Sequence, residues 1–76
     1  MDTSVVYKII AKQMGIDESE LTEATTFEDI DADSLDVFQI IMEIEEKFDM
    51  EFDSDEADNL KTLGDLLGYM KNVLEK

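Results

Sequence analysis

The sequence predicts an all-α fold: a small antiparallel four-helix bundle of three long helices and one short helix, with a long loop between the first two helices. Three observations support this prediction. Apolar residues recur at the three- and four-residue spacing of an amphipathic helix in three separate segments. The chain contains no proline and no internal repeat, and no segment reads as a strand. Its 76 residues suffice for one small core, so we expect a single domain over residues 1–76.

The first helix is expected from about Thr3 to Met14. Asp2 or Thr3 can cap its start, because a short polar side chain accepts a hydrogen bond from a free amide of the first turn. Gly15 suits a left-handed stop at the other end. The apolar stripe of this helix comprises Val6, Ile9, Ile10 and Met14.

The segment from Ile16 to Asp33 has no sustained apolar period. Loops of this length are uncommon in compact domains and tend to be functional or fixed by their own side chains. We therefore expect an ordered loop that crosses the bundle, with a short helical turn near Asp17–Leu21. Its anchors are expected to be Ile16, Leu21, Phe27 and Ile30.

The second helix is expected from Ser34 to about Phe48, with Asp33 as its N-cap. At about 100° per residue, one stripe faces the core: Val37, Ile40, Ile41, Ile44 and Phe48. A second group, called here the apolar strip, consists of Leu35, Phe38 and Met42 and lies about 130° away. Gln39, Glu45 and Glu46 flank it. The apolar strip is either buried under the long loop or a partner-binding face in which methionine adapts to varied surfaces, and we favour the second interpretation.

The remaining chain predicts one short and one long helix. Asp53 or Ser54 can cap a short helix that runs through Leu60, with Ala57 and Leu60 facing inward. Thr62 and Asp65 resemble a capping box at the start of the last helix. The apolar residues of that helix are Leu63, Leu66, Leu67, Met70, Val73 and Leu74. Gly68 inside it costs about 1 kcal/mol relative to alanine, so we expect it to mark close packing against a neighbour.

The charge of the chain restricts its partners. It carries 21 acidic and 6 basic residues, a formal net charge of −15. Nucleic acid and anionic membrane surfaces would be repelled, which leaves basic protein surfaces as the natural partners. The alternative interpretation is that the charge serves only to keep a small protein soluble. No segment could span a bilayer and no leader opens the chain, so a cytoplasmic location is expected.

The sequence offers no metal site and no catalytic group. There is no cysteine and no histidine. A calcium-binding EF-hand loop fails because its twelfth place needs glutamate: registers that begin at Asp29, Asp31 and Asp49 end on Ile40, Met42 and Leu60. A nucleophilic serine needs a base within hydrogen-bond reach, and no lysine lies near Ser34 in sequence. We therefore expect no enzyme, and interpret Ser34, exposed in the first turn of its helix, as a residue that is acted upon.

Three segments of the chain resemble the acyl carrier protein family. Residues 29–36 (Asp-Ile-Asp-Ala-Asp-Ser-Leu-Asp) resemble the attachment motif Asp-Leu-Gly-Ala-Asp-Ser-Leu-Asp of that family. Residues 42–48 (MEIEEKF) are similar to its acidic helix that ends in Phe. Thr62-Leu63-Gly64-Asp65-Leu66, followed by Tyr69, resembles the start of its last helix. The order and spacing of the three segments make the resemblance specific.

The resemblance implies that Ser34 carries 4′-phosphopantetheine through a phosphodiester, and that the terminal thiol holds acyl groups as thioesters. It also implies that the helix beginning at Ser34 is read by basic patches on partner enzymes. The implied partner-binding residues are Asp33, Leu35, Asp36, Phe38, Met42, Glu45 and Glu46. The implied partners are a phosphopantetheinyl transferase and the acyltransferase, ketosynthase, reductases and dehydratase of fatty-acid synthesis. A monomer is expected.

The chain departs from the family pattern at a few positions. Asp31 replaces the usual glycine, which adds charge and restricts the backbone before Ser34. Phe38 and Gln39 stand where a smaller apolar residue and a glutamate are usual, so partner choice can differ. Fatty-acid synthesis is favoured over a carrier dedicated to polyketide or aminoacyl loading. The alternative from another class is an unmodified acidic helical adaptor that binds a basic partner through the same face.

Overall fold

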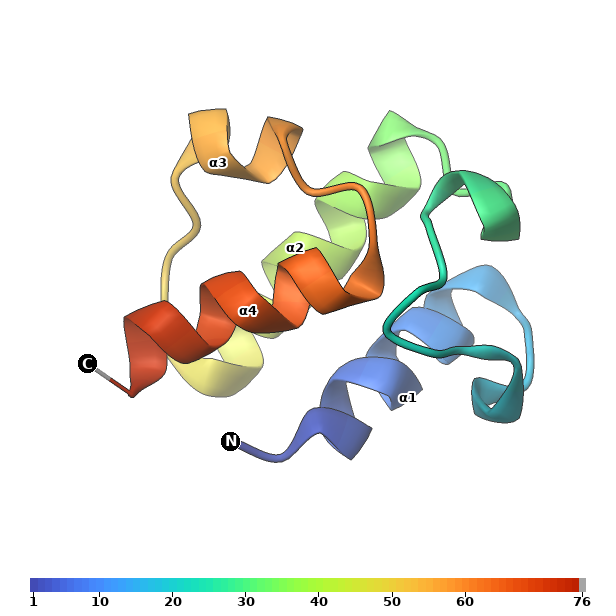
Figure 1. Cartoon of the computed structure of the whole chain (residues 1–76), viewed down its shortest axis with the longest axis horizontal. Coiled ribbons are helices and arrows are strands. Elements are labelled where there is room, and N and C mark those ends of the chain that lie inside the picture. Colours follow the sequence, from blue (N-terminus) through green and yellow to red (C-terminus); the bar gives the residue numbers. More distant parts are fainter. Residues whose placement is uncertain (76) are drawn as a thin grey trace.

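The computed structural model describes residues 1–75, and this part of the chain is helical throughout its regular elements. Within this described part, four α-helices follow one another: α1 (Thr3–Met14), α2 (Ser34–Phe48), α3 (Ser54–Asp58) and α4 (Leu63–Leu74). Helices α2 and α4 run toward the end of the molecule where both termini lie, and α1 runs in the opposite direction (Figure 1). The predicted all-α bundle of three long helices and one short helix is confirmed.

Local side-chain chemistry sets the helix ends. Asp2 caps α1, where its carboxylate accepts a hydrogen bond from the Ser4 amide at 3.0 Å. The helix ends at Gly15, whose φ of 68° is the left-handed conformation expected there. Helix α4 begins with the predicted capping box, in which the Asp65 amide donates to the Thr62 hydroxyl at 3.0 Å and the Asp65 carboxylate accepts from the Thr62 amide.

The short helix α3 is shorter than predicted. Asp53 caps its start, but the helix ends at Asp58 and not at Leu60. The Asn59 amide donates to the Glu56 carbonyl, and the Asn59 side chain donates to the Asp55 carbonyl. These bonds close the last turn tightly, and so the chain leaves the helix two residues early.

The loop between α1 and α2 is ordered, as predicted. It contains two short 3-10 turns, Glu18–Glu20 and Glu28–Ile30, of which only the first was expected. Leu21 and Phe27 are buried, and Ile16 and Ile30 pack against the core. Backbone bonds also join this loop to the start of α4, including one from the Phe27 amide to the Lys61 carbonyl at 3.1 Å. The loop therefore passes beside the α3–α4 connection (Figure 1).

The core lies where α1, α2 and α4 face one another. The fully buried large side chains are Val6, Ile10, Ile40, Ile44, Leu63, Leu66 and Met70. The predicted core stripe of α2 is confirmed for its central isoleucines, while Val37 and Phe48 at its ends are half-buried. None of the described helices has the length and apolar character needed to cross a membrane.

The prediction that Gly68 packs closely against a neighbour is wrong. A Cβ atom added there would meet nothing within 4 Å, because Gly68 lies on the exposed side of α4. Gly64 makes the close approach instead. A Cβ at Gly64 would lie 3.0 Å from the Glu23 carbonyl oxygen, which accepts a hydrogen bond from the Gly64 amide at 2.9 Å.

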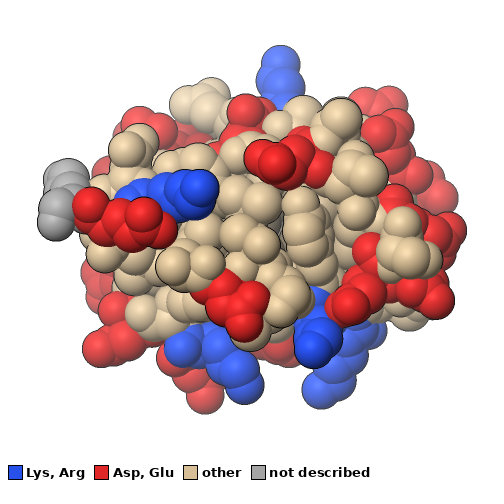
Figure 2. All heavy atoms as spheres, turned by 60° about the horizontal axis from the view of Figure 1, so that its bottom comes forward, with Lys and Arg blue, Asp and Glu red and all other residues tan. Residues whose placement is uncertain are grey.

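The surface is strongly acidic and sparsely paired. Figure 2 shows carboxylates around the rim of one face, with a few lysines at its edges and uncharged atoms at its centre. Within residues 1–75 the only ion pair joins the Met1 ammonium to the Glu75 carboxylate at 3.6 Å. Within the described part, no acidic side chain forms an ion pair with a lysine.

Candidate functional site

Ser34 is the first residue of α2 and is exposed. Asp33 precedes it as the N-cap, as predicted, and accepts a hydrogen bond from the Asp36 amide at 2.9 Å. Asp36 in turn accepts from the Asp33 amide at 3.3 Å, so the two carboxylates form a reciprocal capping box around Ser34. The Ser34 hydroxyl and the amides of Ser34 and Leu35 have no hydrogen-bond partner among the described residues. The serine is thus held in place by its neighbours while its own polar groups remain accessible.

The apolar strip on α2 is exposed. Leu35 is 64% exposed, Phe38 59% and Met42 51%. These values exclude burial of the strip under the long loop, because that loop does not cover it. Glu46 beside it is also exposed, and Asp36 is half-buried by its place in the capping box. This side of α2 is therefore an exposed surface on which large apolar side chains alternate with carboxylates.

Glu45, beside the apolar strip, also has a structural role that the sequence did not predict. It is half-buried, and its carboxylate accepts a hydrogen bond from the Phe52 amide at 2.8 Å. The Phe52 ring stacks on Tyr69 of α4 with ring centroids 5.0 Å apart, and the Tyr69 hydroxyl accepts from the Asp53 amide at 3.0 Å. Glu45 and Tyr69 together tie the segment that leads into α3 to both neighbouring long helices.

A cavity of about 400 Å³ opens beside Ser34, between α2 and α3. Its lining is mostly apolar and combines α2, α3 and the segments that flank α3. The lining residues are Phe27, Ser34, Val37, Phe38, Ile41, Glu45, Phe52, Ser54, Ala57, Asp58 and Leu60. The contribution of α3 was missed in the sequence, where only the inward placement of Ala57 and Leu60 pointed to it.

Among residues 1–75, no arrangement of side chains suitable for hydrolytic chemistry surrounds Ser34. The other residues of the cavity bring no lysine to it. Among residues 1–75 no group of three or more carboxylates is placed to hold a metal ion. The chemistry that this site offers is an accessible hydroxyl at a helix start, next to an apolar cavity and an acidic and apolar face.

Comparison with known proteins identifies this arrangement. Residues 4–70 match the family model described as the phosphopantetheine attachment site. The chain is 48% identical over 66 residues to acyl carrier proteins of Streptococcus pneumoniae strain R6 and of Streptococcus pyogenes serotype M1. Each match covers 87% of this chain and 86% of the relative. The chain therefore belongs to the phosphopantetheine-attachment family, as one of its acyl carrier proteins.

Family membership defines the class of activity. Acyl carrier proteins are carriers and not enzymes, and their working group is a covalently attached 4′-phosphopantetheine. The start of α2 fits such a group, because an accessible hydroxyl and two unpartnered amides meet there at the mouth of an apolar cavity. The thiol that bears the acyl chain is supplied by this group, since the chain itself contains no cysteine.

Proposed function

We propose that this chain carries acyl groups as thioesters on a 4′-phosphopantetheine arm attached to Ser34, and delivers them to enzymes of fatty-acid synthesis. The observation that carries the proposal is the position of Ser34, exposed at the start of α2 within the residue 29–36 motif and on the rim of the cavity. Two of the three other serines lie in different settings, while Ser54 also lines the cavity but lies outside the residue 29–36 motif. The Ser4 hydroxyl already donates to Asp2 at 2.7 Å, and Ser19 lies in a three-residue turn.

Opposing electrostatic effects act on the arm at Ser34. The amides of Ser34 and Leu35 and the positive end of the α2 dipole favour a phosphate ester. The carboxylates of Asp33 and Asp36 repel it, and both are fixed in place by the capping box. Because attraction and repulsion offset each other, we expect the phosphate to bind the protein surface only weakly. The arm then remains mobile, while its covalent bond to Ser34 keeps it attached.

The acyl chain has a place in the protein itself. Val37, Ile41 and Phe52 present apolar surface to the cavity that begins at Ser34. Withdrawal of a saturated chain into it removes apolar surface from water, at about 0.8 kcal/mol per buried methylene. We expect the cavity to shelter the chain between encounters with partner enzymes.

Attachment at Ser34 is tested by incubation with a phosphopantetheinyl transferase and coenzyme A. Intact mass should rise by one arm for the wild type and remain unchanged for Ser34→Ala, because the alanine has no oxygen to form the phosphodiester. The circular dichroism spectrum of the variant provides the folding control. Modification of the alanine variant at Ser54, the remaining serine on the cavity rim, would refute the assignment.

The pathway is tested with the loaded carrier. Malonyl-loaded protein should be accepted and elongated by a reconstituted set of bacterial fatty-acid synthesis enzymes. A carrier dedicated to polyketide or aminoacyl loading would be charged but not elongated by that set. An unmodified adaptor would show no arm in the intact mass of protein purified from its own cells.

The partner-binding face is proposed to comprise Asp33, Leu35, Asp36, Phe38, Met42, Glu45 and Glu46. The support is the exposed apolar strip with its carboxylate rim, which complements a basic enzyme surface. Because the basic partner is proposed to be a cytoplasmic enzyme, we assign the carrier to the cytoplasm and regard it as a monomer that binds one enzyme at a time.

Glu46 is the residue that tests this face, since Glu45 also has a structural hydrogen bond. Glu46→Lys should slow association with a phosphopantetheinyl transferase about tenfold at low salt, because rim charges act mainly on the association rate. Raised salt should weaken wild-type binding and reduce the difference. Stopped-flow or surface-plasmon measurements check this, with Glu43→Lys on another side of α2 as the matched control. Equal rates for the two variants would contradict the assignment.

A further inference from the structure

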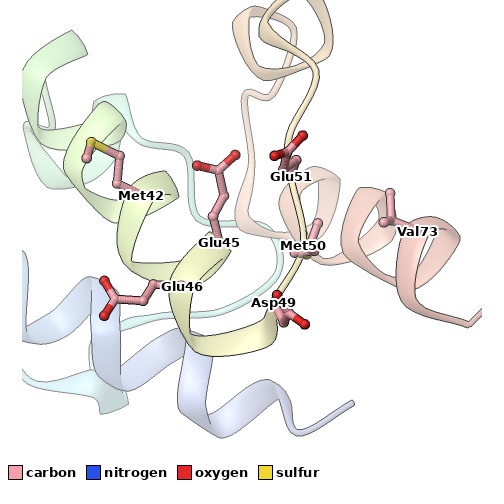
Figure 3. A pocket seen from close by; sticks show the side chains of 7 residues that line it. All are labelled: Met42, Glu45, Glu46, Asp49, Met50, Glu51 and Val73. Atoms are coloured by element: carbon pink, nitrogen blue, oxygen red, sulfur yellow. The ribbon is translucent and has the colours of Figure 1, made fainter.

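A second depression lies at the other end of α2, away from Ser34. This groove has a volume of about 770 Å³ and is open to solvent. Figure 3 shows Val73 of α4 on one side and Met42 and Glu46 of α2 on the other, with Met50 between them. The seven residues that line the groove, called here the α2–α4 groove, are Met42, Glu45, Glu46, Asp49, Met50, Glu51 and Val73.

The floor and the rim of the α2–α4 groove differ in chemistry. Met50 is only 7% exposed and forms the floor, while Met42 (51%) and Val73 (38%) present apolar side chains to solvent at its sides. All four remaining lining residues are acidic, and no lysine among residues 1–75 lines the groove. A groove with an apolar floor and an entirely acidic rim is complementary to an apolar side chain that lies between cationic ones.

The acidic rim is partly fixed before any partner arrives. The carboxylate of Glu45 is held by the Phe52 amide at 2.8 Å. Asp49 ends α2 with a left-handed φ of 52°, and the Met50 amide donates to the Glu45 carbonyl at 3.1 Å. The backbone turn that carries Met50 and the neighbouring acids is therefore ordered, which lowers the entropy cost of binding. The methionine side chains retain the flexibility to fit varied apolar groups.

We propose that the α2–α4 groove binds a cationic amphipathic segment of a partner protein, with one apolar side chain seated on Met50 and lysine or arginine side chains on the rim. The groove shares Met42, Glu45 and Glu46 with the proposed partner-binding face, so the inference rests in part on that function. It extends the contact surface to residues 49–51 and to α4, which are outside the face expected from the sequence. Partners that use it contact the carrier far from the arm.

Methionine methyl groups provide the readout. The chain has five methionines, of which Met42 and Met50 line the groove, while Met14 and Met70 lie elsewhere in or against the core. Protein labelled with carbon-13 at these methyl groups is titrated with a synthetic helical peptide that has leucine on one face and lysine on the other. The Met42 and Met50 resonances should shift together and saturate, while those of Met14 and Met70 remain in place.

Matched variants locate the binding. Val73 and Leu74 are neighbouring, similarly exposed apolar residues of α4, and only Val73 lines the groove. Val73→Ser should weaken the peptide about fivefold through lost apolar contact, and Leu74→Ser should leave its affinity unchanged. Likewise Glu51→Gln should weaken it more than Glu43→Gln, an exposed acid outside the groove. Because only exposed positions are changed, the helical content and melting temperature of these variants should equal those of the wild type.

Two results would overturn the proposal. A peptide with serine in place of leucine that binds equally well would show attraction to the overall negative charge alone. Equal affinities for Val73→Ser and Leu74→Ser would place the contact outside the groove. Neither result concerns the arm, since attachment to Ser34 is measured separately by intact mass. A carrier that accepts the arm but fails the methyl titration would retain the proposed function and lose only the groove.

Discussion

Two glycines four residues apart in α4 have opposite roles. Gly64 has no Cβ because the Glu23 carbonyl oxygen occupies that space, and Gly68 faces solvent with nothing within 4 Å. In the sequence alone, both are glycines within a helical pattern and cannot be told apart. For this reason the close contact was wrongly predicted at Gly68. Whether a helical glycine reflects a close contact depends on the position of another segment, here the loop before α2, and that position is a tertiary property.

Alanine substitution at the two glycines should separate these roles. Gly68→Ala should stabilise the protein by about 1 kcal/mol, through helix propensity alone. Gly64→Ala should be destabilising, because the new methyl group is pressed against a backbone carbonyl that cannot rotate away without losing its hydrogen bond. In a domain of this size 1 kcal/mol corresponds to a shift of about 4–8 °C in Tm. Thermal unfolding followed by circular dichroism checks the prediction, and equal shifts of one sign would contradict it.

Asp31 shows how the sequence can predict strain. It occupies the position where the family usually has glycine, and its φ of 57° is left-handed. Aspartate tolerates this conformation better than most residues but less well than glycine. The expected restriction of the backbone before Ser34 is therefore found at the C-terminal end of the Glu28–Ile30 turn.

Glu45 was harder to interpret from the sequence. A helical wheel places it correctly at the rim of the apolar strip, but its bond to the Phe52 amide joins residues seven apart across the end of the helix. Such a bond depends on how the chain turns after Phe48. The same limitation applies to the α3 side of the cavity, because the packing of a five-residue helix is set by its neighbours.

The helix ends were well predicted at the scale of elements, because capping is local. The pairs Asp33–Asp36 and Thr62–Asp65 are three residues apart, and both form reciprocal boxes. The bounds of α1, α2 and α4 were predictable because a strong apolar period and a cap coincide at each. Helix α3 lacks a long apolar period, and its C-terminal end was misplaced accordingly.

The cap of α4 gives a prediction about pH. Hydrogen bonds from the amides of Thr62 and Lys61 lower the pKa of Asp65 below its ordinary value of 3.8. A carboxylate with a lowered pKa in the folded state contributes stability that is present above the ordinary pKa and is lost as pH falls through the folded pKa. Asp65→Asn should therefore be less stable than wild type at pH 7.

The difference between Asp65→Asn and wild type should shrink as pH falls below 3.8 and disappear only below the lowered folded-state pKa, where the wild-type carboxyl is protonated in both folded and unfolded states. Urea denaturation at a series of pH values checks this. Asp58→Asn, at the exposed end of α3, is the control, because Asp58 does not cap a helix. A stability difference that persists unchanged in acid would show that the charge of Asp65 is not responsible.

At the scale of the whole molecule, charge opposes compaction. A net charge of −15 is confined within 31 × 24 × 21 Å, and the described residues contain one ion pair. Because the Debye length is about 10 Å at 0.1 M salt, added salt screens repulsion between neighbouring acids and across the bundle. Folding should therefore be favoured by salt.

Melting experiments in low-salt buffer test this effect. Tm should rise with sodium chloride and rise at lower concentrations with magnesium, because a divalent ion sits loosely among several carboxylates of the folded state. The expected regions of loose contact are Asp29, Asp31, Asp33 and Asp36, or Asp53, Asp55 and Glu56, and among residues 1–75 neither group has the geometry of a dedicated metal site. Differential scanning calorimetry with matched ionic strengths separates screening from binding. A Tm indifferent to both salts would show that the carboxylates are far enough apart not to interact.

The meeting of the two ends has a topological consequence. The Met1 ammonium lies 3.6 Å from the Glu75 carboxylate, and the start of α2 is at the far side of the molecule (Figure 1). A peptide of a few residues could therefore join the ends into a ring, or splice the whole unit into a surface loop of another protein, without displacing a helix. In either arrangement the start of α2, with Ser34, would lie away from the junction, and an inserted unit would be joined to the other protein by two closely spaced linkers.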